Sequence, residues 1–144
     1  MTDFNSMTLM AAGEMIAEMS TKAAFSSLVL SWDVDEFCGS GSVASKANDL
    51  VKFAKSDMGG QRSVPTANGR CELPRAMIEH AITAPEQSKR NCPDAWSRLV
   101  TGLKMDGFEI GEEKLPDPSG RQSIFEDGPI KIARPTLRRM LPQS

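Results

Sequence analysis

The stretch that decides the fold is CGSGSVASKANDLVKFAKS (residues 38–56), followed after a polar segment by ELPRAMIEHA (residues 72–81). Apolar residues recur in both windows at the spacing of one face of an α-helix. The stripes expected to be buried are Ala47, Leu50, Val51 and Ala54 in the first window and Leu73, Met77, Ile78 and Ala81 in the second. We therefore expect two amphipathic helices that pack on each other.

Three further windows show the same periodicity, and Ser, Thr and Pro stand where helices begin. The expected helices are 8–19 with Thr8 as N-cap, 22–31 with Ser20 or Thr21 as N-cap, 42–57 with Ser42 or Ser45 as N-cap, 72–83, and 93–104 with Pro93 at its first position. The predicted fold class is mainly α: a small helical bundle of about five helices, with a minor β-hairpin or extended element near the C-terminal third.

Turns and loops are expected between these helices. Asp33–Phe37 reads as a single turn, and the glycines and serines that follow it break the chain. The segment Gly59–Cys71 is rich in Gly, Pro, Ser, Thr and Asn and has no periodicity, so we expect a mobile loop there. A polar link is expected over residues 84–92.

The pattern changes in the C-terminal third. Apolar and polar residues alternate over Phe108–Leu115, which predicts a small extended element or hairpin. Residues 116–129 hold several prolines and glycines and are expected to be irregular. Ile130 and Ile132 are expected in a short edge strand, and Pro135–Met140 in a last helical turn.

Composition indicates an ordinary globular protein. The chain has 144 residues, 40% of them hydrophobic and 25% charged, and its net charge of −2 supplies no field that attracts nucleic acid. No apolar run approaches the roughly 18 residues of a membrane-spanning helix, and no signal peptide is recognised. Cys38, Cys71 and Cys92 form no CxxC pair, which fits a reducing compartment. We expect a cytoplasmic protein with no membrane partner.

Candidate chemical motifs are weak, and we expect no catalytic residue, cofactor or metal. Gly39–Ser42 precedes a helix, but Lys46 with Ala47 does not satisfy the GxxxxGK[ST] pattern of a phosphate-binding P-loop, so we interpret it as a helix cap. His80 is the only histidine, and its distance from Cys71 in the sequence does not indicate a nucleophile–base pair. Cys38, Cys71, Cys92 and His80 lack the spacing of a zinc site.

Two other classes of function stay open. One is a metal-dependent hydrolase or nuclease that uses Asp and Glu, for which three or more candidate side chains must converge in one cleft. The candidates are Asp33, Asp35, Glu36, His80, Glu109, Glu112 and Glu113. The other is a small DNA-binding or transcriptional regulator, in which the basic segment Pro135–Leu141 is the helix that contacts DNA.

The helical windows carry a family resemblance. Lys46, with the apolar residues of the first window, and Leu73, Ile78 and Ala81 of the second occupy the places of a "xxKAxxLVxxAxxxG" helix followed by a "xLxxLIxxA" helix. In this the chain resembles the effector-associated, death-like helical domains of bacterial conflict systems. The resemblance implies that these are core and interface positions without a catalytic role.

A second resemblance lies further along the chain. The segment Trp96–Ile110, followed by Leu115 and Pro116, is similar to the "LxxLxxDGFxI…LxP" segment of abortive-infection-type proteins. The domain organisation that follows is a death-like helical module over residues 1–90, with residues 91–144 as a helix and a short β or irregular appendage packed on it.

These observations favour a protein–protein interaction or adaptor module. The resemblance implies a role for it in bacterial antiphage defence. The partner implied is a protein, such as a homologous death-like domain on an effector, rather than nucleic acid. Acidic side chains cluster at one turn and lysines lie on the next helix, and complementary charge of this kind sets which partner binds. The predicted partner-binding residues are Asp33, Asp35, Glu36, Lys46, Lys52 and Lys55.

Overall fold

The computed structural model of the chain describes residues 4–66, 69–116 and 131–140. Over these residues it has seven α-helices, five of them with nine residues or more, and two antiparallel strand pairs. The elements are α1 (Ser6–Met19), α2 (Lys22–Ser31), the 3-10 helix η1 (Asp35–Phe37), α3 (Val43–Lys55), α4 (Asp57–Gly60), β1 (Ser63–Thr66), β2 (Gly69–Glu72), α5 (Leu73–Ala81), α6 (Glu86–Asn91), α7 (Pro93–Met105), β3 (Phe108–Pro116) and β4 (Lys131–Arg139). The predicted fold class is confirmed.

Several predicted helix starts are confirmed by their caps. Thr21 Oγ1 accepts a hydrogen bond from the Ala24 N–H at 3.1 Å, which starts α2. Ser42 Oγ accepts from the Ser45 N–H at 3.1 Å, which starts α3. Pro93 occupies the first turn of α7. Backbone N–H groups there have no acceptor within the helix, so proline, which lacks an N–H, costs no hydrogen bond.

The prediction that Thr8 caps the first helix is wrong, because α1 begins one turn earlier. Asn5 is the N-cap, and its side-chain oxygen accepts from the Thr8 N–H at 3.0 Å. Thr8 is fully buried, and its hydroxyl donates to Asp106 Oδ2 at 3.0 Å instead. Asparagine is as good an N-cap as serine or threonine, so local chemistry allowed either start.

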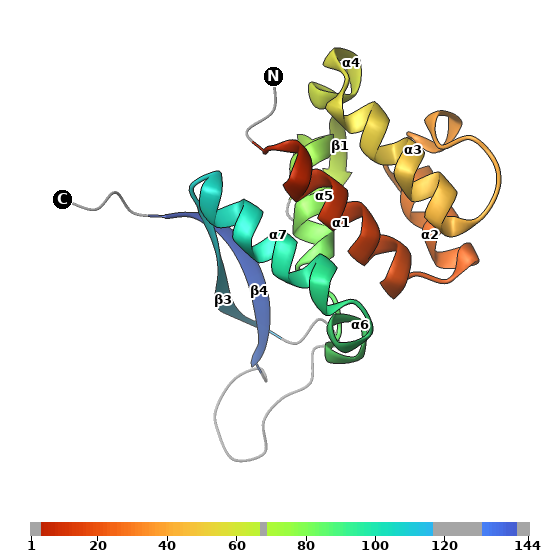
Figure 1. Ribbon diagram of the computed structural model, residues 1–144. Helices are drawn as coiled ribbons and strands as arrows, with labels where there is room; N and C mark the ends of the chain where they lie inside the picture. Colours follow the sequence, from red (N-terminus) through yellow and green to blue (C-terminus); the bar gives the residue numbers. More distant parts are fainter. Residues whose placement is uncertain (1–3, 67–68, 117–130, 141–144) are drawn as a thin grey trace.

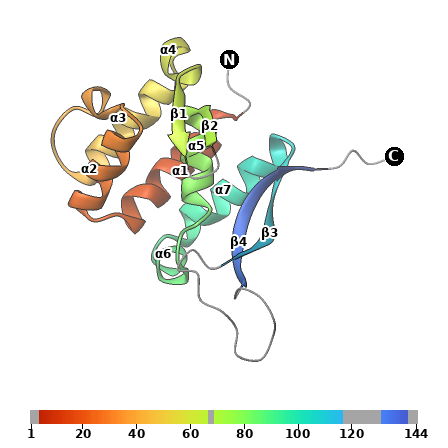
Figure 2. The same ribbon diagram turned by 180° about the vertical axis from the view of Figure 1, so that it is seen from behind.

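α1 is the central helix of the bundle. It packs against α3, α5 and α7, and Figures 1 and 2 show α2 and α3 on one side of it and the β3–β4 pair on the other, beside α7. The two stripes predicted in α3 and α5 are buried in one cluster with residues of α1 and α7. The buried residues of α1 are Thr8, Leu9, Ala11, Ala12, Gly13, Met15 and Ile16.

The loop predicted over Gly59–Cys71 is wrong. This segment holds the end of α4, then β1 paired with β2 in an antiparallel hairpin. Val64 of β1 is fully buried in the core, so the hairpin packs against the helices. Strands of four residues are too short to show alternation, and cross-strand pairing decides their conformation. The polar link expected over residues 84–92 likewise contains α6.

The helical turn predicted over Pro135–Met140 is also wrong, because β4 extends to Arg139. Ile110 of β3 lies opposite Leu137, and Phe108 lies opposite Arg139. Leu137 is buried, and a proline is compatible with an edge strand, where no ladder hydrogen bond needs its N–H. Pairing with a distant strand thus overrides the local preference of this segment.

The C-terminal hairpin is longer than the predicted element Phe108–Leu115, because β3 and β4 have nine residues each. Ile132 lies in a strand, as predicted. Of the irregular segment predicted over residues 116–129, only Pro116 is described, as the last residue of β3. The rest of that segment and Ile130 lie outside the described residues.

Candidate protein-interaction surface

The predicted acidic residues Asp33, Asp35 and Glu36 lie together, exposed, in the turn between α2 and α3. We call these three residues the acidic turn. Arg62 partly compensates Asp33: its Nη2 lies 3.6 Å from Asp33 Oδ2 and donates a hydrogen bond to the Asp33 carbonyl oxygen at 2.8 Å. Asp35 and Glu36 form no ion pair with any residue that the structure describes. The negative charge of the turn is therefore available mainly at these two positions.

An aromatic stack holds the acidic turn against α3. The rings of Phe37, in η1, and Phe53, in α3, are stacked with centroids 3.9 Å apart and planes 5° from parallel. The guanidinium carbon of Arg62 lies 5.3 Å from the centroid of the Phe37 ring. Ring stacking and a cation above a ring both stabilise such a contact, so the turn has a defined position on the helix.

The predicted lysines Lys46, Lys52 and Lys55 do not share one face of α3. Each helical residue advances about 100° around the axis, so residues four apart lie in one row. Lys55 therefore continues the row of Val51, and both Lys52 and Lys55 are exposed in the last turn. Lys46 is half-buried and lies two turns from Phe53, on the side of the acidic turn. The structure brings Lys52 and Lys55 together and separates Lys46 from them.

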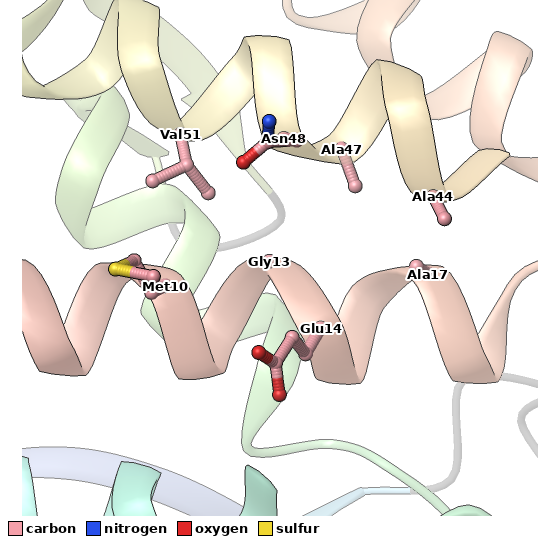
Figure 3. Close-up of a pocket in the computed structure, with 8 residues that line it drawn as sticks. All are labelled: Met10, Gly13, Glu14, Ala17, Ala44, Ala47, Asn48 and Val51. Atoms are coloured by element: carbon pink, nitrogen blue, oxygen red, sulfur yellow. The ribbon is translucent and has the colours of Figure 1, made fainter. Parts of the chain in front are cut away.

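A pocket opens between α1 and α3 (Figure 3). Its lining residue Val51 lies one helical turn before Lys55. The volume of the pocket is about 100 Å³. Small side chains make up most of its lining, which we call the α1–α3 groove: Met10, Gly13, Glu14 and Ala17 from α1, and Ala44, Ala47, Asn48 and Val51 from α3.

Gly13 forms the floor of the groove because α1 and α3 approach each other closely there. A Cβ atom on Gly13 would lie 2.5 Å from Val51 Cγ2, closer than two carbon atoms can pack. Beside this contact, Ala17 and Ala44 are too small to fill the space between the helices (Figure 3). The close approach and the small neighbours together leave a mainly apolar pocket between the two helices.

The edge of the groove carries an exposed apolar side chain but little free charge. Met10 is 47% exposed. The carboxylate of Glu14 turns away from α3 (Figure 3), and its Oε2 accepts a hydrogen bond from Arg98 Nη2 of α7 at 2.6 Å. The uncompensated charge near the groove is therefore the positive charge of Lys52 and Lys55.

Sequence reasoning missed the groove. The spacing of Gly13 and Ala17, and that of Ala44 and Asn48, places each pair one turn apart on a helix. This spacing was a usable signal for a close helix contact. It could not show which helix would lie opposite, because that depends on packing between segments about 30 residues apart.

The other groups considered for a catalytic or metal site are His80, the cysteines and the carboxylates. His80 meets the Trp32 ring edge-on at 6.1 Å, and burial lowers its pKa. Burial, helped by the nearby carboxylates of Asp49 and Asp35, raises the pKa of the Cys38 thiol to about 11, so this cysteine stays protonated at neutral pH. Within the described residues, no group of three or more His, Cys, Asp or Glu side chains is placed to hold a metal ion.

The DNA-binding hypothesis required the basic segment Pro135–Leu141 to form a helix. The basic segment Pro135–Met140 is a strand rather than a helix through Arg139, and Leu141 lies outside the described residues. Its Arg138 forms an ion pair with Glu109 at 2.9 Å. The guanidinium of Arg139 lies over the Phe108 ring, 4.8 Å from its centroid. These arginines contact residues of their own hairpin.

Two further findings concern the length of the helices and the comparisons with known proteins. No helix in the described part of the chain is long and apolar enough to cross a lipid bilayer. Comparisons of the chain with protein-family models, with curated proteins and with solved structures find no match.

Proposed function

We propose that this chain is a protein–protein interaction module that binds its partner through the α1–α3 groove together with Lys52 and Lys55. One observation carries the proposal: an apolar pocket of about 100 Å³ lies one turn from two exposed lysines that have no ion pair with a described residue. An apolar pocket for an anchoring side chain, bordered by charge, is the usual anatomy of a protein interface.

The size of the groove favours a protein side chain over a small-molecule ligand. Pockets for drug-sized ligands and cofactors usually enclose about 300 to 1,000 Å³. Even benzene occupies an apolar cavity of about 150 Å³. A pocket of about 100 Å³ has room for one aliphatic side chain, such as a leucine, projecting from a partner.

The charges beside the groove define the chemistry of that partner. Lys52 and Lys55 are three residues apart in the last turn of α3, so their ammonium groups project from one side. An acidic segment that carries an aliphatic anchor complements this surface. Such charge complementarity mainly raises the association rate and selects among partners, and salt weakens it.

We include in the proposal an adaptor role in bacterial antiphage defence, with a homologous death-like domain on an effector as the partner. The resemblance of the helical windows to such domains supports this setting. The charge asymmetry between the acidic turn and Lys52 and Lys55 supports pairing between related domains, because each surface is complementary to the other.

A comparative pull-down from the native host tests the proposal. Tagged wild-type protein is compared with the double variant Lys52→Glu and Lys55→Glu by quantitative mass spectrometry. We expect the variant to retain at least tenfold less of the partner, about 1.4 kcal/mol of binding free energy. The double variant Lys22→Glu and Lys104→Glu is the matched control, because both lysines are exposed on other helices and the change in net charge is the same.

Both variants must keep the fold for the comparison to count. Two glutamates in the last turn of α3 oppose the helix dipole and are expected to lower the free energy of unfolding by about 1 kcal/mol. Equal capture of one partner by wild type and the Lys52/Lys55 variant would contradict the proposed surface. Equal loss in the control would point to net charge alone.

A further inference from the structure

A second surface of the chain has the complementary chemistry. Leu30, in the last turn of α2, is 64% exposed. The Asp33 N–H donates a hydrogen bond to the Leu30 carbonyl oxygen at 3.0 Å, so Leu30 is tied to the acidic turn. Asp35 and Glu36 follow directly and are exposed. An exposed aliphatic side chain a few residues before unpaired carboxylates in the chain has the chemistry that complements an apolar pocket bordered by lysines.

These two surfaces lie on opposite sides of α3. Val51 lines the α1–α3 groove, whereas Phe53 stacks on Phe37 of η1. Two residues along a helix correspond to a rotation of about 200°, so the groove and the turn face away from each other. One chain cannot seat its own Leu30 in its own groove, but two chains can meet in this way.

We propose that copies of this chain associate head to tail, with Leu30 of one copy seated in the α1–α3 groove of the next. Asp35 and Glu36 of the first copy then face Lys52 and Lys55 of the second. This inference rests on the proposed function, because it names the occupant of the same groove. The fit of charge and of apolar shape is the argument for a second copy rather than an unrelated protein.

Such an interface joins two different patches and is therefore heterologous. A copy whose groove is occupied still has a free Leu30 surface, and a copy whose Leu30 is bound still has a free groove. Heterologous contacts give open chains of subunits unless the rotation between copies closes a ring. One anchoring side chain and rim charges bury little area, so the association is weak, concentration-dependent and sensitive to salt.

Sedimentation velocity of the full chain measures this association. We expect the mean mass of the wild type to rise with concentration, from about 10 µM to about 1 mM, and to fall back in high salt. Leu30→Lys removes the anchor, and Ala44→Trp fills the groove from an exposed position. Each is expected to weaken association at least tenfold. Met105→Lys is the matched control, because Met105 is 71% exposed at the end of α7 and outside both surfaces.

Mixing the two variants gives the sharpest test. The Leu30→Lys chain keeps an intact groove, and the Ala44→Trp chain keeps an intact Leu30 surface. A head-to-tail interface therefore predicts that the mixture forms a dimer of one chain of each kind and stops there. A two-fold interface between identical patches predicts no such rescue. Should Ala44→Trp unfold the protein, the Lys52→Glu and Lys55→Glu variant replaces it as the groove-defective chain.

Several outcomes would overturn the inference: a wild type that stays monomeric throughout, variants that associate normally, or a mixture without rescue. The host pull-down separates this failure from that of the proposed function. If the wild type is monomeric but captures a host protein that the groove-defective variant loses, the groove binds another partner and the proposed function stands. If the groove variants change neither self-association nor capture, both proposals are wrong.

Discussion

The hydroxyl of Thr8, in the first turn of α1, donates a hydrogen bond to Asp106 Oδ2 at 3.0 Å, across 98 residues of sequence. The backbone N–H and the side-chain amide of Asn5 donate to the same carboxylate, each at 3.0 Å. Gly102 makes room for this contact, because a Cβ atom there would collide with Thr8. The start of the central helix is thereby joined to the end of α7.

Asp106→Ala is expected to destabilise the fold substantially. It leaves the buried Thr8 hydroxyl without its acceptor and removes a charged acceptor from Asn5, so we expect the free energy of unfolding to fall by about 3 kcal/mol. Urea denaturation measures this change. Lys104→Ala, an exposed change on the same helix end, should stay within about 0.5 kcal/mol of wild type. A similar small effect of Asp106→Ala would show that the carboxylate contributes no net stability.

Gly13→Ala tests the close contact between α1 and α3. In an isolated helix this change stabilises by about 1 kcal/mol. Here the new methyl group would meet Val51 Cγ2 at 2.5 Å, and valine has little rotamer freedom in a helix. Overpacking of this kind costs about 1 to 3 kcal/mol, so the net effect is destabilising.

The control for Gly13→Ala is a double-mutant cycle with Val51→Ala. Removing the valine methyl groups leaves space for the alanine, so the double variant should be more stable than the sum of the single changes predicts. Additive free energies of unfolding would mean that the two side chains do not compete for this space.

The stability of the protein is expected to depend on pH through His80. Burial lowers the pKa of this imidazole below its ordinary value of 6.5. Just below pH 6.5 the unfolded chain therefore binds more protons than the folded one, and the free energy of unfolding falls as the pH drops through this window. His80→Gln should give a flatter profile of Tm between about pH 5 and pH 7 than the wild type. Parallel profiles would contradict this role of His80.

Local chemistry was enough to predict the long helices. The caps Thr21 and Ser42 and the proline at Pro93 act within one turn of the chain, and the apolar spacing in α3 and α5 is a property of each segment alone. Such signals do not depend on what packs nearby. The start of α1 shows their limit, because Asn5 and Thr8 are both competent caps, and the helix start depends on how both residues contact the distant Asp106.

The candidate site was predicted only in part. The acidic turn and the exposed pair Lys52 and Lys55 lie within short stretches, so their grouping could be predicted from the sequence. Lys46 was placed with them wrongly, since it lies on the side of α3 that faces the acidic turn. The predictions gave the charges of the surface but not the apolar pocket between α1 and α3.

The sequence by itself determined the identity and approximate bounds of the long helices, since hydrogen bonds within a helix join residues only four apart. Tertiary structure alone decided the strands β1 and β2 and the extension of β4 over Pro135–Arg139, because these segments need a partner strand to pair their backbone groups. It also decided the groove, because the contact of Gly13 with Val51 and the space beside it exist only once two separate helices pack. Spacing within one segment carries no information about which distant segment will lie against it.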